Sequence, residues 1–337
     1  VSFIPWLIDD SSGVGTQLTV VDLNGDGAPD IVVGNKRGTF VLTHTKELVS
    51  EEAYAAAAPK RTDHPAHRAG GADFAAHVRT TDPLSPEEER ARFILPEGFS
   101  VDLIASEPDI AKPMNMAFDR RGRLWVTSTV EYPYPAPLDQ PGRDTLKVLE
   151  DADGDGVFEN VTTFVDGLNI PIGVIPYGDG AICWSIPNIW FFHDEDGDGV
   201  ADRREKLFGP FDHTRDTHGM VNSFTLGADG WIYACHGFNN RSEVAGKDGH
   251  TVTLQSGNVF RFKPDGSRIE HFGHGQVNPF GLTIDRYGDV FTADCHTKPV
   301  SLVLEGGFHQ SFGKPHDGVG FVPDMMDHLN GSTAICG

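Results

Sequence analysis

The sequence is poor in cysteine and has no long hydrophobic run. Its 337 residues contain four cysteines, Cys183, Cys235, Cys295 and Cys336, and no Cys-x-x-Cys pair. A zinc ribbon and a c-type haem attachment site are therefore excluded within this chain. No apolar stretch reaches the roughly 18–20 residues that a membrane-spanning helix needs. We accordingly predict no membrane span.

Basic residues are also scarce. Lys and Arg number 27 against 49 Asp and Glu, which gives a formal net charge of −22 at pH 7. Nucleic acids and anionic membrane surfaces bind basic patches, so this charge argues against both as partners. The chain also begins at Val1 without an initiator Met or a recognisable leader. We therefore expect a processed or truncated piece of a longer protein.

Three short loops share one acidic pattern, at residues 22–30, 151–159 and 194–202. In each loop an oxygen-bearing side chain stands at positions 1, 3, 5 and 9, and a glycine at position 6 permits a sharp turn. Ca²⁺ prefers about 6–8 oxygen ligands at such spacing, so the pattern predicts up to three structural calcium sites. A metal-free acidic turn is the alternative. The predicted ligands, with Glu205 at position 12 of the third loop, are Asp22, Asn24, Asp26, Asp30, Asp151, Asp153, Asp155, Glu159, Asp194, Asp196, Asp198, Asp202 and Glu205.

A second repeat predicts the fold. Four segments, at 116–126, 173–184, 224–234 and 282–292, share an apolar strand, a turn with Asp and Gly, and a second apolar strand. Each is a hairpin signal, and the turn acids recur every 50 to 60 residues, at Asp119, Asp179, Asp229 and Asp285. A period of about 50 residues built from hairpins is typical of an all-β protein with a β-propeller fold. An irregular β-sandwich that reuses hairpins is the alternative.

The first 94 residues have a different composition. An acidic loop and a strand-like segment come first, and a stretch rich in Ala, His, Pro and charge follows, as in a linker. Within this stretch, Ser85, Pro86 and Glu88 predict the capped start of a short helix. We therefore expect three regions: residues 1–45, a linker at 46–94, and a propeller at 95–337 whose C-terminal end is missing.

Four motifs carry a family resemblance: LPEGFSVDLIASEPDIAKPMNMAFDRRGRLWVT, DADGDGVFENVTTFVDGLNIPIGV, DTHGMVNSFTLGADGWIYACHG and GQVNPFGLTIDRYGDVFTADCH. They resemble the membrane-bound dehydrogenase-type propellers of planctomycetes and verrucomicrobia, distant relatives of soluble glucose and sorbosone dehydrogenases. Residues 1–45 resemble the end of an FG-GAP (integrin-type) repeat, whose hallmark is the loop Asp-x-Asn-x-Asp-Gly-x-x-Asp. The first resemblance implies a six-bladed propeller, periplasmic or exported. Longer members often carry a haem module, and its Cys-x-x-Cys-His motif is absent from this chain.

The resemblance also implies a catalytic site. In soluble aldose dehydrogenases, a His shortly before a hairpin takes a proton while hydride moves to pyrroloquinoline quinone (PQQ). His218 stands at the matching position, with Asp216 and Asn222 as candidates to orient it. An Arg-Asn pair contacts the quinone in those enzymes. Here Asn278 matches the pattern as a cofactor-binding residue, whereas Val277 replaces the arginine.

Histidines near the hairpins offer a competing site. His236 and His296 each follow a cysteine, and with His218 they would converge on one mouth of a propeller. Several imidazoles with a carboxylate suit a transition metal such as Zn, Cu or Fe, and the same residues are candidates to bind a cofactor. Arg241 and Arg215 lie in the same predicted loops. They are candidates to bind a carboxylate or phosphate, or to pair with surface acids.

Three functions remain open. The first is a periplasmic or extracellular sugar or alcohol dehydrogenase of the quinone-dependent type. It would oxidise a carbohydrate or small polyol and pass electrons to a c-type cytochrome. The second is a calcium-stabilised propeller that binds glycans or proteins without turnover, which the missing arginine favours. The third is a metal-dependent polysaccharide hydrolase or lyase that uses the clustered histidines.

Overall fold

Strands make up most of the structure. The computed structural model describes residues 17–35, 38–45, 48, 50–56, 84–295, 300–309 and 322. These residues form β1 (Gln17–Val21), β2 (Asp30–Asn35), β3 (Gly38–His44), α1 (Glu51–Ala56), α2 (Pro86–Arg90), β4 (Phe99–Ala105), β5 (Lys112–Phe118), β6 (Leu124–Thr129), β7 (Asp144–Glu150), β8 (Asn160–Leu168), β9 (Val174–Tyr177), β10 (Gly180–Ser185), β11 (Asn188–His193), β12 (Arg203–Phe208), β13 (Val221–Leu226), β14 (Ile232–His236), β15 (Arg241–Ala245), β16 (Thr251–Gln255), β17 (Gly257–Phe262), β18 (Ile269–Gln276), β19 (Asn278–Ile284), β20 (Val290–Cys295) and β21 (Ser301–Val303).

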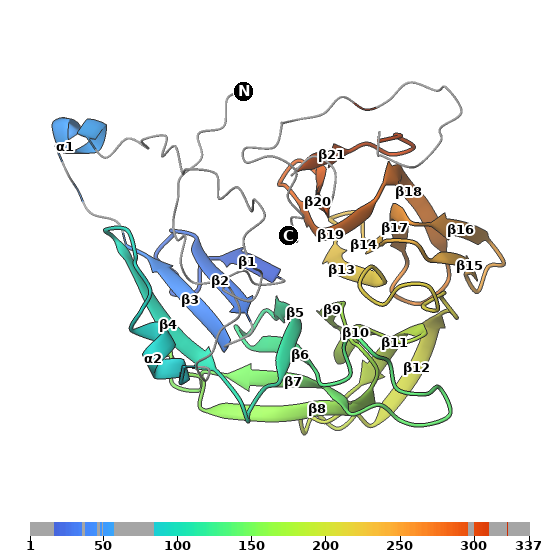
Figure 1. The fold of residues 1–337 in the computed structure, drawn as a ribbon, viewed down its shortest axis with the longest axis horizontal. Coiled ribbons are helices and arrows are strands. Elements are labelled where there is room, and N and C mark those ends of the chain that lie inside the picture. Colours follow the sequence, from blue (N-terminus) through green and yellow to red (C-terminus); the bar gives the residue numbers. More distant parts are fainter. Residues whose placement is uncertain are drawn as a thin grey trace, which may run out of the picture.

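The strands form the blades of a β-propeller. Blade 1 has the order β1-β2-β3-β4, blade 2 β5-β6-β7-β8, blade 3 β9-β10-β11-β12, blade 4 β13-β14-β17-β18 and blade 5 β19-β20-β21. Neighbouring strands are antiparallel, and the hairpin β15-β16 is a separate sheet inserted within blade 4. Figure 1 shows the blades arranged around a common centre, with the first strand of each blade innermost.

Burial follows from this arrangement, because neighbouring blades cover both faces of a central strand. Strands β6 and β10 are buried along their whole length. Trp184 of β10 belongs to a large apolar cluster that runs from blade 3 into blade 4, and its ring meets Phe211 edge-on with centroids 5.5 Å apart. Stacking blades therefore supplies the hydrophobic core.

The four predicted hairpins are confirmed. They are the pairs β5-β6, β9-β10, β13-β14 and β19-β20, the first two strands of blades 2 to 5. In each of the four turns a glycine has positive φ, at Gly122, Gly178, Gly230 and Gly288. A side chain is disfavoured in that conformation, so the Asp-Gly turn signal has a direct steric cause.

The expectation of six blades is wrong for the described residues, which form five. Residues 17–44 supply only three strands of blade 1, and β4, from beyond the predicted linker, pairs with β3 as the fourth. The N-terminal segment and the later propeller region are thus joined in one sheet. The proposed division into three regions at 45 and 95 stays a prediction.

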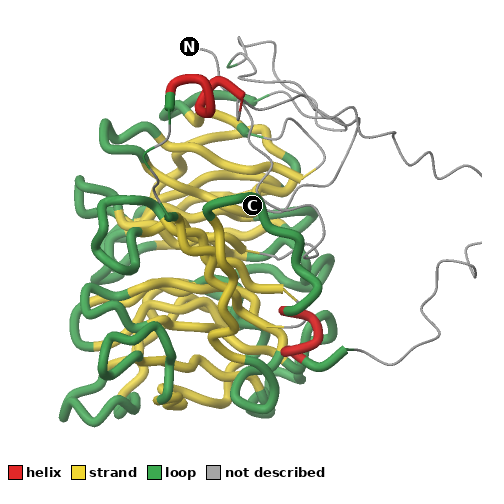
Figure 2. Tube along the Cα trace, turned by 90° about the vertical axis from the view of Figure 1, so that its left-hand side faces the viewer, coloured by secondary structure: helices red, strands yellow, loops and turns green. Residues whose placement is uncertain are grey.

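The two helices are short and lie at the edge of the strand-rich body (Figure 2). The predicted cap of α2 is confirmed: Ser85 Oγ accepts from the Glu88 amide at 3.2 Å, and the Glu88 carboxylate accepts from the Ser85 amide at 2.9 Å. Arg90 Nε then donates to the Val101 carbonyl at 3.1 Å and docks the helix on β4. Neither helix in the described part of the chain is long and apolar enough to cross a membrane.

A buried carboxylate ties blade 2 to the segment that leads to blade 3. Asp144 is 1% exposed and accepts hydrogen bonds from the Thr129 hydroxyl and from the amides of Val130, Glu131 and Ile170, at 2.7 to 3.0 Å. The three amide donors belong to two separate segments that lie outside the strands. Asp144 therefore fixes the loop between β6 and β7 on the blade 2 to blade 3 connection.

Replacing Asp144 with Asn should lower the free energy of unfolding by about 2–4 kcal/mol, because hydrogen bonds to a charged acceptor contribute about 1.5–3 kcal/mol each and one acceptor oxygen is lost. Denaturant unfolding followed by tryptophan fluorescence measures the change. Asp139→Asn, at an exposed position in the same loop, is the matched control. Equal stability of the two variants would contradict the bridging role.

Candidate functional site

The two faces of the propeller carry different residues. In an antiparallel blade, the hairpin between the first two strands lies on one face, and the segments entering the first strand and leaving the second lie on the other. The Asp-Gly turns and the acidic loops occupy the first, here called the turn face. His218, the start of β19 and the end of β14 occupy the second, here called the mouth face.

His218 and Asp216 form a pair on the mouth face. His218 Nδ1 lies 2.9 Å from Asp216 Oδ1, and the same oxygen accepts from the His218 amide at 2.6 Å. The His218 side chain is 62% exposed, whereas that of Asp216 is 14% exposed. The ring of Tyr132, from blade 2, contacts the imidazole edge-on with centroids 5.3 Å apart. The carboxylate thus fixes Nδ1 and leaves Nε2 as the atom able to accept a proton.

The loop that carries this pair is held by Asn240, which is fully buried. Asn240 Oδ1 accepts from the amides of Arg215 and Asp216 at 3.3 and 3.1 Å, and Nδ2 donates to the Asp216 carbonyl at 2.7 Å. Thr217 Oγ1 also donates to the Pro133 carbonyl at 2.7 Å, which links the loop to blade 2. His218 is therefore presented by a fixed backbone.

Asn222 does not orient His218. It is fully buried, and its Nδ2 donates to the carbonyls of Met220 and Pro279, at 2.9 and 3.3 Å. Its Oδ1 accepts from the Ser223 hydroxyl at 2.7 Å. These bonds join β13 to β19, so the predicted orienting residue instead holds the seam between blades 4 and 5.

Asn278 starts β19, and its Oδ1 accepts from the Phe238 amide at 3.0 Å. The fully buried Asp294 carboxylate accepts from the amides of Val277 and Asn278 at 3.1 and 2.7 Å. The Val277 side chain is itself buried, at 3% exposure. Position 277 therefore offers neither a cation nor access to a ligand. This segment does not fit the quinone carboxylates that the family pattern pairs with an arginine.

Arg215 and Arg241 are exposed cations on this face. Asn240 joins their segments, because it holds the Arg215 amide and directly precedes Arg241. The Arg241 amide donates to Asp212 Oδ2 at 3.0 Å. Burial raises the pKa of Asp212, but hydrogen bonds from Arg241 and Thr214 outweigh it and hold that pKa below its ordinary value. Asp212, which accepts from the Arg241 amide, thus stays ionised.

His236 is a buried histidine with a structural role. It is 1% exposed, its Nδ1 lies 3.0 Å from the Ser256 carbonyl oxygen, and its Nε2 lies 2.9 Å from Ser242 Oγ. With both nitrogens against protein groups, it is not arranged to bind a metal or cofactor. His296 lies outside the described residues. Among the described residues, the groups of three or more potential metal ligands contain carboxylates and no histidine.

Three residues that shape the mouth face were not predicted from the sequence: Asp144, Asn240 and Asp294. All three are buried, and their side-chain oxygens accept hydrogen bonds from backbone amides of the segments between strands. Asp144 begins β7, and Asp294 stands one residue before the end of β20. Asp294 is the only charged residue of β20, which is a signal that could have pointed to it, whereas β7 also carries Lys147 and Glu150 and Asp144 does not stand out.

On the turn face, the three acidic loops repeat one hydrogen-bond pattern. The carboxylate at loop position 1 accepts from the amide at position 6 at 2.8 to 3.0 Å. The carboxylate at position 9 accepts from the amide at position 2 at 2.7 to 3.3 Å. The sequence repeat is therefore a structural repeat, although the first loop joins strands one and two of its blade and the others join strands three and four.

Two of the loops gather carboxylate oxygens that lie within 4.8 Å of one another. The groups are Asp151, Asp153, Asp155 and Glu159 in the second loop, and Asp194, Asp196 and Asp202 in the third. This is the donor set that Ca²⁺ prefers.

The remaining predicted ligands are placed differently. Asp22, Asp26 and Asp30 form no such group, and the fully buried Asp30 accepts from the amides of Leu23 and His44. Asp198 and Glu205 are not part of the third-loop group. Glu205 instead pairs with Lys247 at 2.9 Å and Arg203 at 3.4 Å, and the hydrogen bond from Lys247 holds its pKa below the ordinary value.

A family model described as a domain of unknown function, DUF7133, matches residues 85–323. The chain belongs to this family. A second model, described as an FG-GAP repeat, matches residues 14–46 and confirms the predicted resemblance of the N-terminal segment. The DUF7133 match includes β4 and the FG-GAP match includes β1 to β3, so blade 1 combines strands from both. No curated protein matches the chain.

Several solved structures are similar to the DUF7133 chain. A protein from Thermus thermophilus described as a putative oxidoreductase (glucose dehydrogenase) is 16% identical with a TM-score of 0.41, over 64% of this chain and 69% of that one. The PQQ domain of a pyranose dehydrogenase from Coprinopsis cinerea is 17% identical with a TM-score of 0.37, over 61% of this chain and 47% of that one. The propeller assignment itself follows from the sheet order of the DUF7133 chain. An origin in planctomycetes or verrucomicrobia stays a prediction.

Replacing Asn240 with Ala should release the 215–218 loop. The amides of Arg215 and Asp216 lose their acceptor, and a hydrogen bond of about 0.5–1.5 kcal/mol corresponds to a roughly 2- to 13-fold change. Hydrogen exchange of peptides that span residues 212–219 should accelerate by that amount. Glu243→Ala, an exposed position in β15, should leave the exchange unchanged. Wild-type exchange in Asn240→Ala would show that this side chain does not hold the loop.

Proposed function

We propose that the mouth face oxidises a hydroxyl group of a sugar or small polyol, with His218 as the base. The observation that carries the proposal is the exposed imidazole whose Nδ1 lies 2.9 Å from the Asp216 carboxylate. A base of this kind needs a fixed tautomer and an open second nitrogen, and His218 has both. Asp216 stabilises the imidazolium that forms when Nε2 takes the hydroxyl proton.

Oxidation of the alcohol also requires an acceptor for the hydride from the same carbon. The sequence resemblance implies a quinone, and PQQ would supply that acceptance when bound. Because Val277 is buried, we assign the role of holding the quinone carboxylates to the exposed Arg215 and Arg241. Onward transfer to a c-type cytochrome and a periplasmic or extracellular location belong to the same proposal.

A second candidate function is a propeller that binds carbohydrate or protein without turnover. The buried Val277 favours it, because the familiar cation of the quinone site is missing. The hydrolase or lyase alternative has no such support among the described residues, since His236 is enclosed by Ser242 and Ser256.

Titration of calcium-loaded protein with PQQ, followed by a panel of aldoses and polyols, tests the dehydrogenase proposal. We expect saturable binding and substrate-dependent reduction of the quinone absorbance. His218→Ala should slow the reduction by at least about 100-fold, since general-base catalysis contributes about 10²–10⁴-fold. The same variant should leave the quinone affinity unchanged, because the base does not hold the quinone.

Arg215→Gln combined with Arg241→Gln should instead weaken PQQ binding, because these two residues are proposed to hold the quinone carboxylates. His250→Ala, an exposed histidine outside the mouth face, should resemble the wild type. Failure to bind PQQ, or full activity in His218→Ala, would overturn the dehydrogenase proposal in favour of the binding propeller.

We further propose that the acidic loops bind Ca²⁺, with the second and third loops as the main sites. Their converging carboxylates support this assignment. Without a cation, four acids in the second loop and three in the third would repel one another. Bound Ca²⁺ would replace that repulsion with attraction and fix the loops that lead into β8 and β12.

Chelation with EDTA should therefore lower the melting temperature. A ligand present at 100 times its Kd stabilises the folded state by about 2.7 kcal/mol, and that contribution is lost on removal. Asp153→Ala should reduce the EDTA-induced shift, whereas Asp166→Ala, an exposed acid on β8, should leave it intact. Scanning calorimetry with metal analysis gives both quantities. A calcium-free preparation with the same melting curve in EDTA would refute the assignment.

A further inference from the structure

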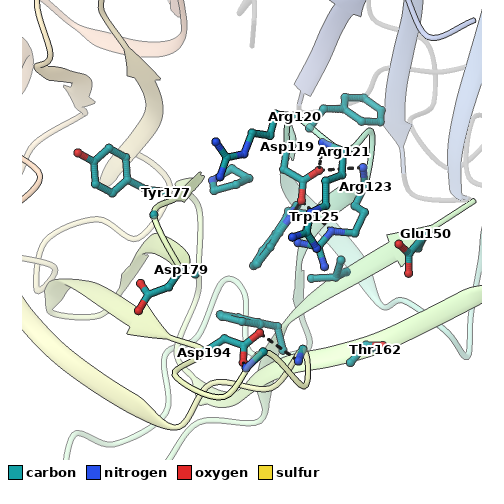
Figure 3. Close-up of a pocket in the computed structure, with 18 of the residues that line it drawn as sticks. Asp119, Arg120, Arg121, Arg123, Trp125, Glu150, Thr162, Tyr177, Asp179 and Asp194 are labelled. Atoms are coloured by element: carbon teal, nitrogen blue, oxygen red, sulfur yellow. Dashed lines mark hydrogen bonds and ion pairs between the residues drawn. The ribbon is translucent and has the colours of Figure 1, made fainter.

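A cleft of about 990 Å³ opens on the turn face between blades 2 and 3, on the opposite side of the propeller from His218. One wall is the β5-β6 turn, and the other comprises the β9-β10 turn and the third acidic loop (Figure 3). The apolar side chains of Trp125, Val148 and Phe164 are among its lining residues. Its size falls in the range of ligand sites, about 300–1,000 Å³.

One arginine of the cleft is neutralised internally. Arg123 Nε donates to Asp119 Oδ2 at 2.8 Å, and its guanidinium lies over the Trp125 ring, 5.5 Å from the centroid. Burial raises the pKa of Asp119, but hydrogen bonds from Trp125, Arg121 and Arg123 outweigh it and hold that pKa below its ordinary value. Arg123 and Asp119 therefore stay a charged pair that shapes the wall.

Arg120 and Arg121 differ from Arg123. Both are exposed and line the cleft, and in the described part of the chain neither guanidinium has a hydrogen bond or an ion pair. Figure 3 shows Arg120 extending from its turn toward the side of the cleft from which Tyr177 comes. Two cations that follow one another in the sequence and line the same cleft without partners offer charge that an anionic ligand can neutralise.

The carboxylates of the facing wall are engaged elsewhere. Asp179 Oδ1 lies 3.0 Å from His193 Nδ1. Asp194 accepts from the amides of Gly197 and Gly199 at 2.7 and 3.0 Å, and it belongs to the third-loop acid group. Asp198, the third acid of this wall, accepts from the Val200 amide at 2.8 Å. Among the described residues no hydrogen bond or ion pair joins these acids, or Glu150 on the blade 2 wall, to Arg120 or Arg121, so both guanidinium groups stay available to a ligand.

Tyr177 adds an aromatic surface beside this charge. It is half-buried, and its ring packs edge-on against Phe191 with centroids 5.9 Å apart. A ring held in this way offers a rigid contact for a sugar. The Asp179 side chain is 49% exposed, and its carboxylate keeps lone pairs beyond the contact with His193 that can accept from sugar hydroxyls. The combination of two free guanidinium groups, one aromatic ring and one carboxylate suits a ligand that carries both an anionic group and hydroxyls.

We propose that this cleft binds an anionic sugar, a uronate or a sulfated residue of an acidic polysaccharide. Its carboxylate or sulfate lies between Arg120 and Arg121, because guanidinium groups match such anions with paired N–H donors. The sugar ring packs on Tyr177, and its hydroxyls reach Asp179. The proposal is independent of the chemistry at His218.

Calorimetric titration with three trisaccharides in the presence of calcium tests the proposal: a galacturonate trimer, a sulfated trimer and uncharged cellotriose. We expect at least one anionic trimer to bind at least about tenfold more tightly than cellotriose, and the stronger of the two distinguishes carboxylate from sulfate. Arg120→Gln combined with Arg121→Gln should weaken that binding by about tenfold for each guanidinium lost, without changing the melting temperature.

Arg286→Gln is the matched control, because Arg286 occupies the position of Arg120 in the corresponding turn of blade 5 and is also exposed. It removes one positive charge from a turn on the same face and should bind the trimer like the wild type. His218→Ala should also bind normally, which separates this site from the proposed catalytic site. The proposal is overturned if neither anionic trimer binds, if cellotriose or inorganic sulfate binds as tightly, or if the double variant keeps wild-type affinity.

Discussion

Backbone amides in the segments between blades have no neighbouring strand whose carbonyl groups could accept their hydrogen bonds. Oxygen atoms of buried side chains accept these hydrogen bonds instead. Buried amides left unpaired are costly, so such acceptors are required rather than optional. Asp144 serves the segment before blade 3, Asp294 serves the start of β19, and Asn240 serves the loop before β13. Non-glycine residues with positive φ occur beside these acceptors, among them Ile170 and Asn239. The mouth face is thereby a rigid surface, on which an exposed side chain such as His218 keeps a defined position.

Strand direction then separates two kinds of chemistry. Antiparallel pairing sends the tight Asp-Gly turns to one face and the longer connections to the other. The turn face collects the acidic loops and the arginines of the β5-β6 turn, which are short-range features of sequence. The mouth face collects groups from different blades, as the contact between Tyr132 and His218 illustrates. The proposed calcium sites and the proposed proton transfer at His218 therefore lie on opposite faces. We expect substitutions in the acidic loops to leave the His218 site unchanged, and substitutions at His218 to leave the acidic loops unchanged.

The features that could be predicted from the sequence are those encoded locally. The Asp-Gly turns and the capping box each depend on residues that are close in the sequence, and both are confirmed. The acidic loops are equally local, and their repeat recurs in their hydrogen bonds, while calcium binding stays a prediction. The composition of blade 1 depends instead on β3 pairing with β4 across more than fifty residues, which no local pattern encodes. For the same reason, the sequence could not show that His218 is exposed and His236 is enclosed. His218 precedes β13 and His236 ends β14, and the contacts of His236 with Ser242 and Ser256, which enclose it, are visible only in the structure.

The departure at position 277 also has a structural cause. The Val277 amide is held by the fully buried Asp294, and its side chain lies in the core. A guanidinium at this position would have to be buried beside Asp294, and a buried ion pair gains little unless its geometry and hydrogen bonds are complete. The carboxylate is already occupied by two backbone amides, so the chain gains nothing by placing a cation there. Any anionic group bound at this mouth must therefore rely on exposed cations, and Arg215 and Arg241 are set on either side of the Asn240 clamp. The proposed affinity for an anionic cofactor therefore depends on how firmly Asn240 holds these two segments.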